Sequence, residues 1–224
     1  IDTSGAALHK RGYRPESNIA PLRETLAAEM VKISRPREDV LFWDPMCGSG
    51  TIAIEAAMKM QNRAPGMMRC FAAERFPFIK RETWKSARTE AHDIITPTDF
   101  EVYASDIDEA CVSLTRENAK RAGVSDNIKV FRKDALTIET EGRRGTVVCN
   151  PPYGERMGTK REAEELYRKM GRHFRTLDSW QIYIISSCED FSMLYGQRPD
   201  RTKKLYNGMI PCKYYQFFKR RDKK

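Results

Sequence analysis

The chain has 224 residues, of which 40% are hydrophobic and 32% are charged, a composition that supports a folded core and excludes intrinsic disorder. Lys and Arg outnumber Asp and Glu by 40 to 31, so the formal charge of +9 favours a polyanionic partner such as nucleic acid. No apolar run is long enough for a membrane helix, and no signal peptide is visible. The six cysteines are scattered without a Cys-x-x-Cys pair, which predicts a cytoplasmic protein with neither a metal site nor a disulfide framework.

Helices and strands are predicted to alternate along almost the whole chain. The first helix begins after Pro21, where apolar residues recur at helical spacing, namely Leu22, Leu26, Met30 and Ile33. Further helices are predicted at residues 51–60, 77–93, 108–123 and 162–177. Strands are predicted at residues 40–44, 101–106, 128–132, 146–150 and 181–186, and a hairpin at residues 203–219 around Asn207-Gly208.

This alternation defines the expected fold class, which is α/β. It predicts a doubly wound, mostly parallel sheet with helices on both faces and an antiparallel C-terminal hairpin. Such sheets bind ligands beyond the carboxyl ends of their strands. The segments that follow Asp44, Asp106, Arg132 and Cys149 are therefore the places where a site is expected.

A glycine-containing turn joins the strand at residues 40–44 to the helix at residues 51–60, and it reads Asp44-Pro45-Met46-Cys47-Gly48-Ser49-Gly50-Thr51. Gly48 and Gly50 allow a ligand to approach the backbone, and the helix behind them offers free N–H groups. With Ala53 the turn also matches the relaxed dinucleotide fingerprint G-x-G-x-x-A. An ordinary tight turn between a strand and a helix would have the same sequence features, so this motif alone leaves the two interpretations open.

Two acidic residues follow the next two strands. Asp106 ends a strand, where a carboxylate can accept both hydroxyls of a ribose, although it lies 56 residues after Gly50 rather than the usual ~20. Glu74 is nearer in sequence, but its surroundings do not resemble a strand, so Asp106 after an insertion is the preferred candidate. Helix capping is the alternative role for Asp106, and Asp108 could cap instead. Asp134 follows a third strand, where an acid could bond an adenine amino group.

The sequence Asn150-Pro151-Pro152-Tyr153-Gly154 directly follows an apolar strand and is the most specific motif in the chain. Two prolines at the end of a buried strand remove two backbone donors and hold the neighbouring carbonyls rigidly. The Asn150 side-chain oxygen and a fixed carbonyl can together grip an exocyclic amino group. The ring of Tyr153 offers a surface on which a base can stack.

Together these elements resemble the class I S-adenosylmethionine (SAM) methyltransferases, and the Asn-Pro-Pro-Tyr element resembles that of enzymes that methylate amino groups. Nearly the whole chain is similar to the RlmL type of 23S rRNA guanine-N2 methyltransferases. The similarity rests on DTSGAALHKRGYR, APLRETLAA, DPMCGSGTIAIEAA, RAPGMMRCFAAERF, YASDID and NPPYGERMG.

The resemblance implies the role of each candidate residue. SAM is surrounded by Asp44, Pro45, Cys47, Gly48, Ser49, Gly50 and Thr51, with further contacts from Ile107, Ala135 and Asn150. Asp106 binds its ribose and Asp134 its adenine amino group. The residues Asn150, Pro151, Pro152 and Tyr153 hold the target guanine. The resemblance further implies that residues 1–20 are a linker from an upstream RNA-binding THUMP domain and that residues 21–224 form the methyltransferase domain.

The basic side chains suggest where RNA is held. Lys10, Arg11, Arg14 and Arg156 are candidate phosphate contacts, although a solvated basic surface would have the same composition. The principal alternative function is adenine-N6 methylation of RNA or DNA. A glutamine methylase, a nicotinamide-dependent oxidoreductase that uses the glycine turn, and a non-catalytic RNA-binding module are further alternatives, and each leaves either the basic charge or the Asn-Pro-Pro-Tyr element unexplained.

Overall fold

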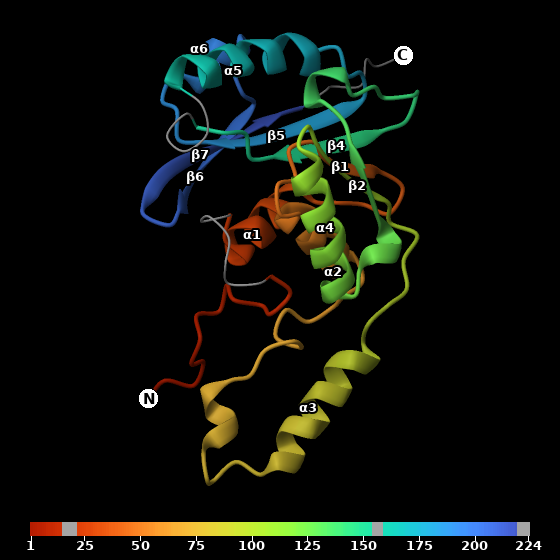
Figure 1. The fold of residues 1–224 in the computed structure, drawn as a ribbon, viewed down its shortest axis with the longest axis vertical. Helices are drawn as coiled ribbons and strands as arrows, with labels where there is room; N and C mark the ends of the chain where they lie inside the picture. Colours follow the sequence, from red (N-terminus) through yellow and green to blue (C-terminus); the bar gives the residue numbers. More distant parts are fainter. Residues whose placement is uncertain (15–21, 154–158, 219–224) are drawn as a thin grey trace.

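A seven-stranded sheet forms the centre of the molecule, with its strands in the order β3-β2-β1-β4-β5-β7-β6 (Figure 1). The computed structural model describes residues 1–14, 22–153 and 159–218. The strands are β1 (Leu41–Asp44), β2 (Val102–Asp106), β3 (Ile128–Arg132), β4 (Gly145–Cys149), β5 (Trp180–Ser186), β6 (Arg201–Asn207) and β7 (Ile210–Phe217). The first five strands pair in parallel, and β7 runs antiparallel to both β5 and β6. The predicted mostly parallel sheet with an antiparallel hairpin is thus confirmed.

Helices cover both faces of this sheet. The helices are α1 (Glu24–Ser34), α2 (Thr51–Met60), α3 (Arg81–Asp93), α4 (Glu109–Ala122), α5 (Lys160–Phe174) and α6 (Phe191–Tyr195). Because side chains alternate along a strand, Phe42 packs in the core beneath α1, α2 and α4, while Leu41 and Trp43 pack in the core beneath α5 and α6. In the described ranges, every helix is too short or too polar to traverse a lipid bilayer.

The predicted boundaries differ from the observed ones at a few helices. The segment at 77–93 becomes helical only at Arg81, after the turn that contains Pro77. Helix α6 was not predicted, because its five residues are too few to show a helical period. The other predicted strands and helices differ from the observed ones by three residues or fewer, and the hairpin turns at Gly208, whose φ of 67° is a conformation that glycine adopts readily.

The segment between α2 and β2 leaves the sheet and returns to the point at which it left. We call residues 61–96 the arm. The Thr96 N–H donates to the Gln61 carbonyl oxygen over 2.9 Å, which closes the arm at its base. Figure 1 shows that α3 projects away from the sheet, and none of its residues is buried. The arm is therefore attached to the amino-end side of the strands, whereas ligands are expected at their carboxyl ends.

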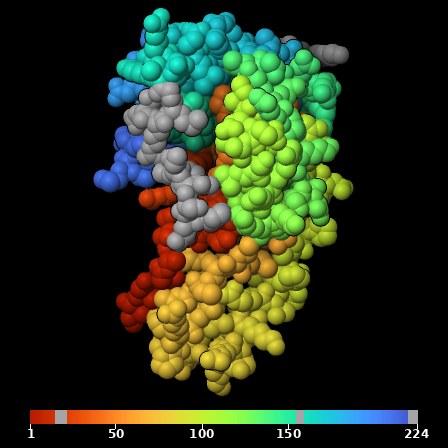
Figure 2. All heavy atoms as spheres, viewed as in Figure 1, coloured from red at the N-terminus to blue at the C-terminus, as the bar shows by residue number. Residues whose placement is uncertain are grey.

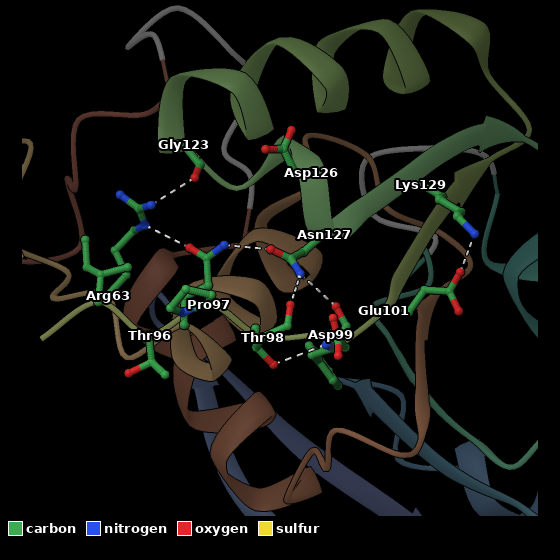
Figure 3. Close-up of a pocket in the computed structure, with 13 residues that line it drawn as sticks. Arg63, Thr96, Pro97, Thr98, Asp99, Glu101, Gly123, Asp126, Asn127 and Lys129 are labelled. Atoms are coloured by element: carbon green, nitrogen blue, oxygen red, sulfur yellow. Dashed lines mark hydrogen bonds and ion pairs between the residues drawn. The ribbon is translucent and has the colours of Figure 1, made fainter.

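A pocket of about 640 Å³ lies at the base of the arm (Figure 3). Asn127 bonds the Gln61 side chain over 2.6 Å and donates to the carbonyl oxygens of Thr98 and Phe100 over 2.9 and 3.0 Å. Arg63 donates to the Gln61 side chain over 3.1 Å and to the Gly123 carbonyl over 3.0 Å. These polar groups satisfy one another, so the pocket fixes the arm to β2, β3 and α4.

Candidate active site

Three predicted site segments meet at one edge of the sheet. Strand β1 pairs in parallel with β2 on one side and with β4 on the other, so their carboxyl ends are neighbours. Asp44 ends β1, Asp106 ends β2, and Asn150 directly follows β4. This is the edge at which parallel α/β sheets bind ligands.

The glycine turn is held by backbone bonds to the neighbouring strand. The Cys47 N–H donates to the Ser105 carbonyl over 2.9 Å, and the Gly48 N–H donates to Asp106 Oδ2 over 2.9 Å. Both glycines have a positive φ, 53° at Gly48 and 80° at Gly50. A Cβ at Gly48 would meet no atom within 4 Å, whereas one at Gly50 would lie 2.7 Å from Thr115 Cγ2. The turn is thus open to a ligand beside Gly48 and closely packed at Gly50.

Two polar residues of α4 support the turn from behind, and sequence reasoning missed both. Thr115 Oγ1 donates to the Gly48 carbonyl over 3.0 Å, and Asn118 Nδ2 donates to the Ser49 carbonyl over 2.9 Å. Both side chains are fully buried. They lie three residues apart on one face of α4, and this spacing was the only signal in the sequence.

Asp44 and Asp106 place two carboxylates close together in a partly desolvated site. Asp44 is 1% exposed, and burial raises its pKa well above the ordinary value. The Met46 N–H lowers the pKa of Asp44, and the charge of Asp106 raises it. A cationic ligand beside these two groups would favour the ionised form of Asp44 and relieve the repulsion between them.

Asp106 is available for a ligand because another residue caps the following helix. Asp108 accepts a bond from the Ala110 N–H over 2.9 Å and is the N-cap of α4, as the sequence suggested. The two oxygens of Asp106 accept from Gly48 and Asp108 N–H groups, and each carboxylate oxygen has capacity for a further bond.

The remaining predicted cofactor contacts lie around the same edge. Ile107 is 62% exposed beside Asp106, so its apolar side chain is accessible at this edge. Asp134 follows β3 and accepts the Leu136 N–H over 2.9 Å, which caps a short 3-10 helix that begins at the buried Ala135. Pro45 is buried, and Ser49 and Thr51 bond each other through their hydroxyl groups over 3.1 Å.

The Asn-Pro-Pro-Tyr segment is anchored by two tyrosine hydroxyl groups. Tyr153 donates to Asn150 Oδ1 over 2.6 Å, and Tyr167 of α5 donates to the Pro152 carbonyl oxygen over 2.8 Å. Pro151 is buried, and the half-buried Tyr153 ring packs against the core beneath α1 and α2. Burial raises the pKa of Tyr153 well above its ordinary value, so its hydroxyl remains a donor at neutral pH. The first hydroxyl orients the asparagine oxygen, and the second fixes the carbonyl next to it.

Replacing Tyr167 by phenylalanine should slow catalysis more than it lowers stability. The variant loses the bond to Pro152 but keeps the ring, so we expect the free energy of unfolding to fall by only about 1 kcal/mol. The kcat should fall roughly tenfold, because misplacement of a reacting group by a fraction of an ångström is costly. Tyr214→Phe is the matched control, since Tyr214 also donates to a backbone carbonyl, that of Met30 on α1, and lies in the core on the other face of the sheet from Tyr167. Equal kcat values for the two variants, measured by steady-state kinetics, would contradict the anchoring role.

Arg11 and Arg14 were predicted to contact phosphate, but both bond other residues of the chain. Arg11 is 9% exposed and forms an ion pair with the buried Glu55 of α2, which also accepts from Tyr13 over 2.9 Å. Burial raises the pKa of Glu55 to about 7, and the Arg11 charge lowers it. Arg11 thus has a structural role, because its guanidinium group lies in the interior, beside a carboxylate of this chain.

Arg14 joins the N-terminal segment to the glycine turn. Its guanidinium group bonds Glu24 over 2.8 Å, Thr51 Oγ1 over 3.1 Å and Ser49 Oγ over 3.4 Å. We therefore assign Arg14 a positioning role rather than a phosphate contact. Lys10 is exposed, and Arg156 lies outside the described residues.

The fold and the site together define a class I SAM-dependent methyltransferase fold. Residues 11–216 match the family described as RMKL-like, methyltransferase domain. The chain belongs to this family.

Three proteins illustrate the similarity. YpsC of Bacillus subtilis is 42% identical over 219 residues, which cover 97% of this chain and 57% of YpsC. The ribosomal RNA large subunit methyltransferase K/L of Aliivibrio salmonicida is 41% identical over 95% of this chain and 31% of its own length. The crystal structure of SMU.472 complexed with SAH (S-adenosylhomocysteine) superimposes with a TM-score of 0.93 at 37% identity, and covers 100% of this chain and 59% of that one. The chain thus spans less than two thirds of the length of these relatives.

Proposed function

We propose that this chain binds SAM and transfers its methyl group to the exocyclic N2 of a guanine in 23S rRNA. The observation that carries the proposal is the meeting of the glycine turn with the Asn-Pro-Pro-Tyr segment at the carboxyl ends of β1 and β4. The glycine turn suits a nucleotide-containing cofactor, and the Asn-Pro-Pro-Tyr segment suits an amino group. One relative that aligns with nearly all of this chain is named ribosomal RNA large subunit methyltransferase K/L, which supports rRNA as the substrate.

The cofactor half of the site suits a positively charged nucleoside. The open space beside Gly48 leaves room for it, and the carboxylates of Asp44 and Asp106 favour a cation. When bound, SAM supplies the methyl group from its sulfonium centre. We assign the ribose hydroxyls to Asp106 and the adenine amino group to Asp134, with Ile107 and Ala135 as apolar neighbours of the base. The complex of SMU.472 with SAH supports SAM as the cofactor.

The acceptor half of the site suits an exocyclic amine. The oxygen of Asn150 has one lone pair bonded to Tyr153 and a second lone pair available, and the carbonyl oxygen of Pro151 lies next to it in sequence. Two such acceptors orient the amine and stabilise the positive charge that develops on its nitrogen. The proton then leaves to water. A base within a duplex must first be flipped out, at a cost of a few kcal/mol.

RNA binding in this proposal uses Lys10 and Arg156, but not the internally bonded Arg11 and Arg14. Residues 21–224 would form the catalytic domain and residues 1–20 the linker to an upstream RNA-binding domain.

A gene deletion tests the proposed reaction. We expect 23S rRNA purified from a strain without the full-length gene to lose one equivalent of N2-methylguanosine, as measured by mass spectrometry of nucleosides. The wild-type gene should restore it, and a gene with Asn150→Ala should not. An unchanged level of this nucleoside would contradict the proposal. Loss of N6-methyladenosine instead would support the alternative, adenine-N6 methylation, which the Asn-Pro-Pro-Tyr segment also suits.

A further inference from the structure

The arm displays a row of basic side chains that the proposed catalytic site does not use. Along α3, Arg81, Lys85, Arg88 and His92 recur every three or four residues, so they lie along one side of the helix. The same helical periodicity places Glu82 and Glu90 on other sides of the helix. Lys85, Arg88 and His92 line a depression of about 410 Å³, together with Thr89. The helix therefore presents a basic side and an acidic side.

Contacts on the inner side of α3 fix the orientation of the helix. Trp84 points toward the rest of the arm and stacks on Phe71, with ring centroids 5.7 Å apart. Arg88 donates to the Met67 and Arg69 carbonyls over 2.9 Å and forms an ion pair with Glu74 over 2.7 Å. These contacts hold α3 against residues 67–74, and they leave the cations at the start of the helix turned to solvent.

Three cations at the start of α3 are available to a partner. Lys80, Arg81 and Lys85 are exposed, and they form no ion pair with any residue that the structure describes. Phe78 lies just before them, and 78% of its surface is exposed. We call Phe78, Lys80, Arg81 and Lys85 the arm patch. Figure 2 shows that the arm, coloured orange to yellow, forms the lower end of the molecule.

We propose that the arm patch is an RNA-binding surface that holds the phosphate backbone of structured RNA away from the reacting guanine. A cluster of three exposed cations suits a polyanion, because each phosphate contact releases a counterion and the contributions add. An exposed aromatic ring beside such a cluster is suited to stack on an unpaired base. The proposal rests on the proposed function, since it takes RNA as the partner.

The arm is also connected to the glycine turn through the N-terminal segment. Arg69 is 8% exposed and donates to the carbonyl oxygens of Ser4, Ala6, Ala7 and Lys10. Further along the same segment, Arg11 pairs with Glu55 and Arg14 bonds Thr51, both on α2. RNA held by the arm patch is therefore held at a fixed position relative to the site.

A charge-removal variant of the full-length protein tests this surface. The arm variant carries Lys80→Gln, Arg81→Gln and Lys85→Gln, and the matched control carries Lys32→Gln, Arg37→Gln and Arg198→Gln, which removes the same charge from exposed positions elsewhere. Binding of a fluorescein-labelled RNA stem-loop is measured against salt concentration. We expect the arm variant to bind more weakly, with a slope of log K against log salt shallower by roughly 0.9 for each phosphate that the protein no longer neutralises. The control should match the wild type.

Catalysis separates this inference from the proposed function. With rRNA as substrate, the arm variant should raise the KM for RNA while leaving the Kd for SAM and the kcat unchanged. Equal salt slopes for the arm variant and the control would overturn the inference even if the enzyme methylates rRNA normally. A wild-type protein that fails to methylate rRNA would contradict the proposed function, and the stem-loop measurement would still decide whether the arm patch binds RNA.

Discussion

Replacing Asn150 by alanine is expected to abolish methyl transfer and to leave SAM affinity nearly unchanged. The variant removes the side-chain oxygen that Tyr153 orients and that would accept the amine of the target base. Loss of one preorganised polar group at a reacting centre costs about 10²–10³ in kcat. The measurement is single-turnover methylation of the RNA substrate, with SAM binding followed separately by calorimetry.

Asn150→Asp is the matched control for this experiment. It keeps an acceptor oxygen of similar reach, so it should retain more transfer than Asn150→Ala. A large loss of SAM binding in Asn150→Ala, with the fold intact, would contradict the assignment of Asn150 to the acceptor amine. Equal loss of kcat in the two variants would show that the acceptor oxygen is not the property that matters.

Gly171→Ala should produce the largest loss of stability among simple substitutions. A Cβ at Gly171 would lie 1.9 Å from the carbonyl oxygen of Tyr195, where α5 packs against α6. The obstacle is backbone, so the two helices must separate, and overpacking of this kind costs about 3 kcal/mol. This outweighs the gain of roughly 1 kcal/mol from the higher helix propensity of alanine. The net loss of about 2 kcal/mol should lower the melting temperature by roughly 4–8 °C in a calorimetric scan.

Lys169→Ala provides the comparison on the same helix. Lys169 is exposed and makes a 3.8 Å surface pair with Glu165, so its loss should change stability by less than about 0.5 kcal/mol. Similar melting temperatures for the two variants would contradict the close approach of α5 to α6. Gly171 also lies one turn from Tyr167, so its replacement should additionally disturb the bond to Pro152.

Most helices and strands were predictable because the sequence patterns that specify them are local. Helix α2 was predicted with its observed bounds, since apolar residues fill it and the glycine turn precedes it. Gly123 ends α4 with a φ of 70°, a conformation that glycine adopts readily. Helix α6 was missed because five residues carry no period, and its stability comes from packing against α5.

The candidate site was predictable only in part. Asp44, Asp106 and Asn150 were identified as candidates because each ends a predicted strand. Arg11 was assigned to phosphate because its basic charge is visible in the sequence. Its pairing with Glu55 is not visible there, because Glu55 lies 44 residues away. Contacts between distant segments decide whether an arginine is buried, and one sequence does not record them. For the same reason Tyr167, 15 residues from Pro152 and on another element, was not recognised.

The closed base of the arm has a consequence for how such proteins change over evolution. A segment whose ends already meet adds only a small entropic cost when it lengthens, about 0.6 kcal/mol for each doubling of its length. The bond between Thr96 and Gln61 lets β2 begin at the same place whatever is inserted between them. Residues can therefore be added to or removed from the parts of the arm that do not contact the N-terminal segment without shifting the opposite edge of the sheet, so recognition and chemistry can diverge separately.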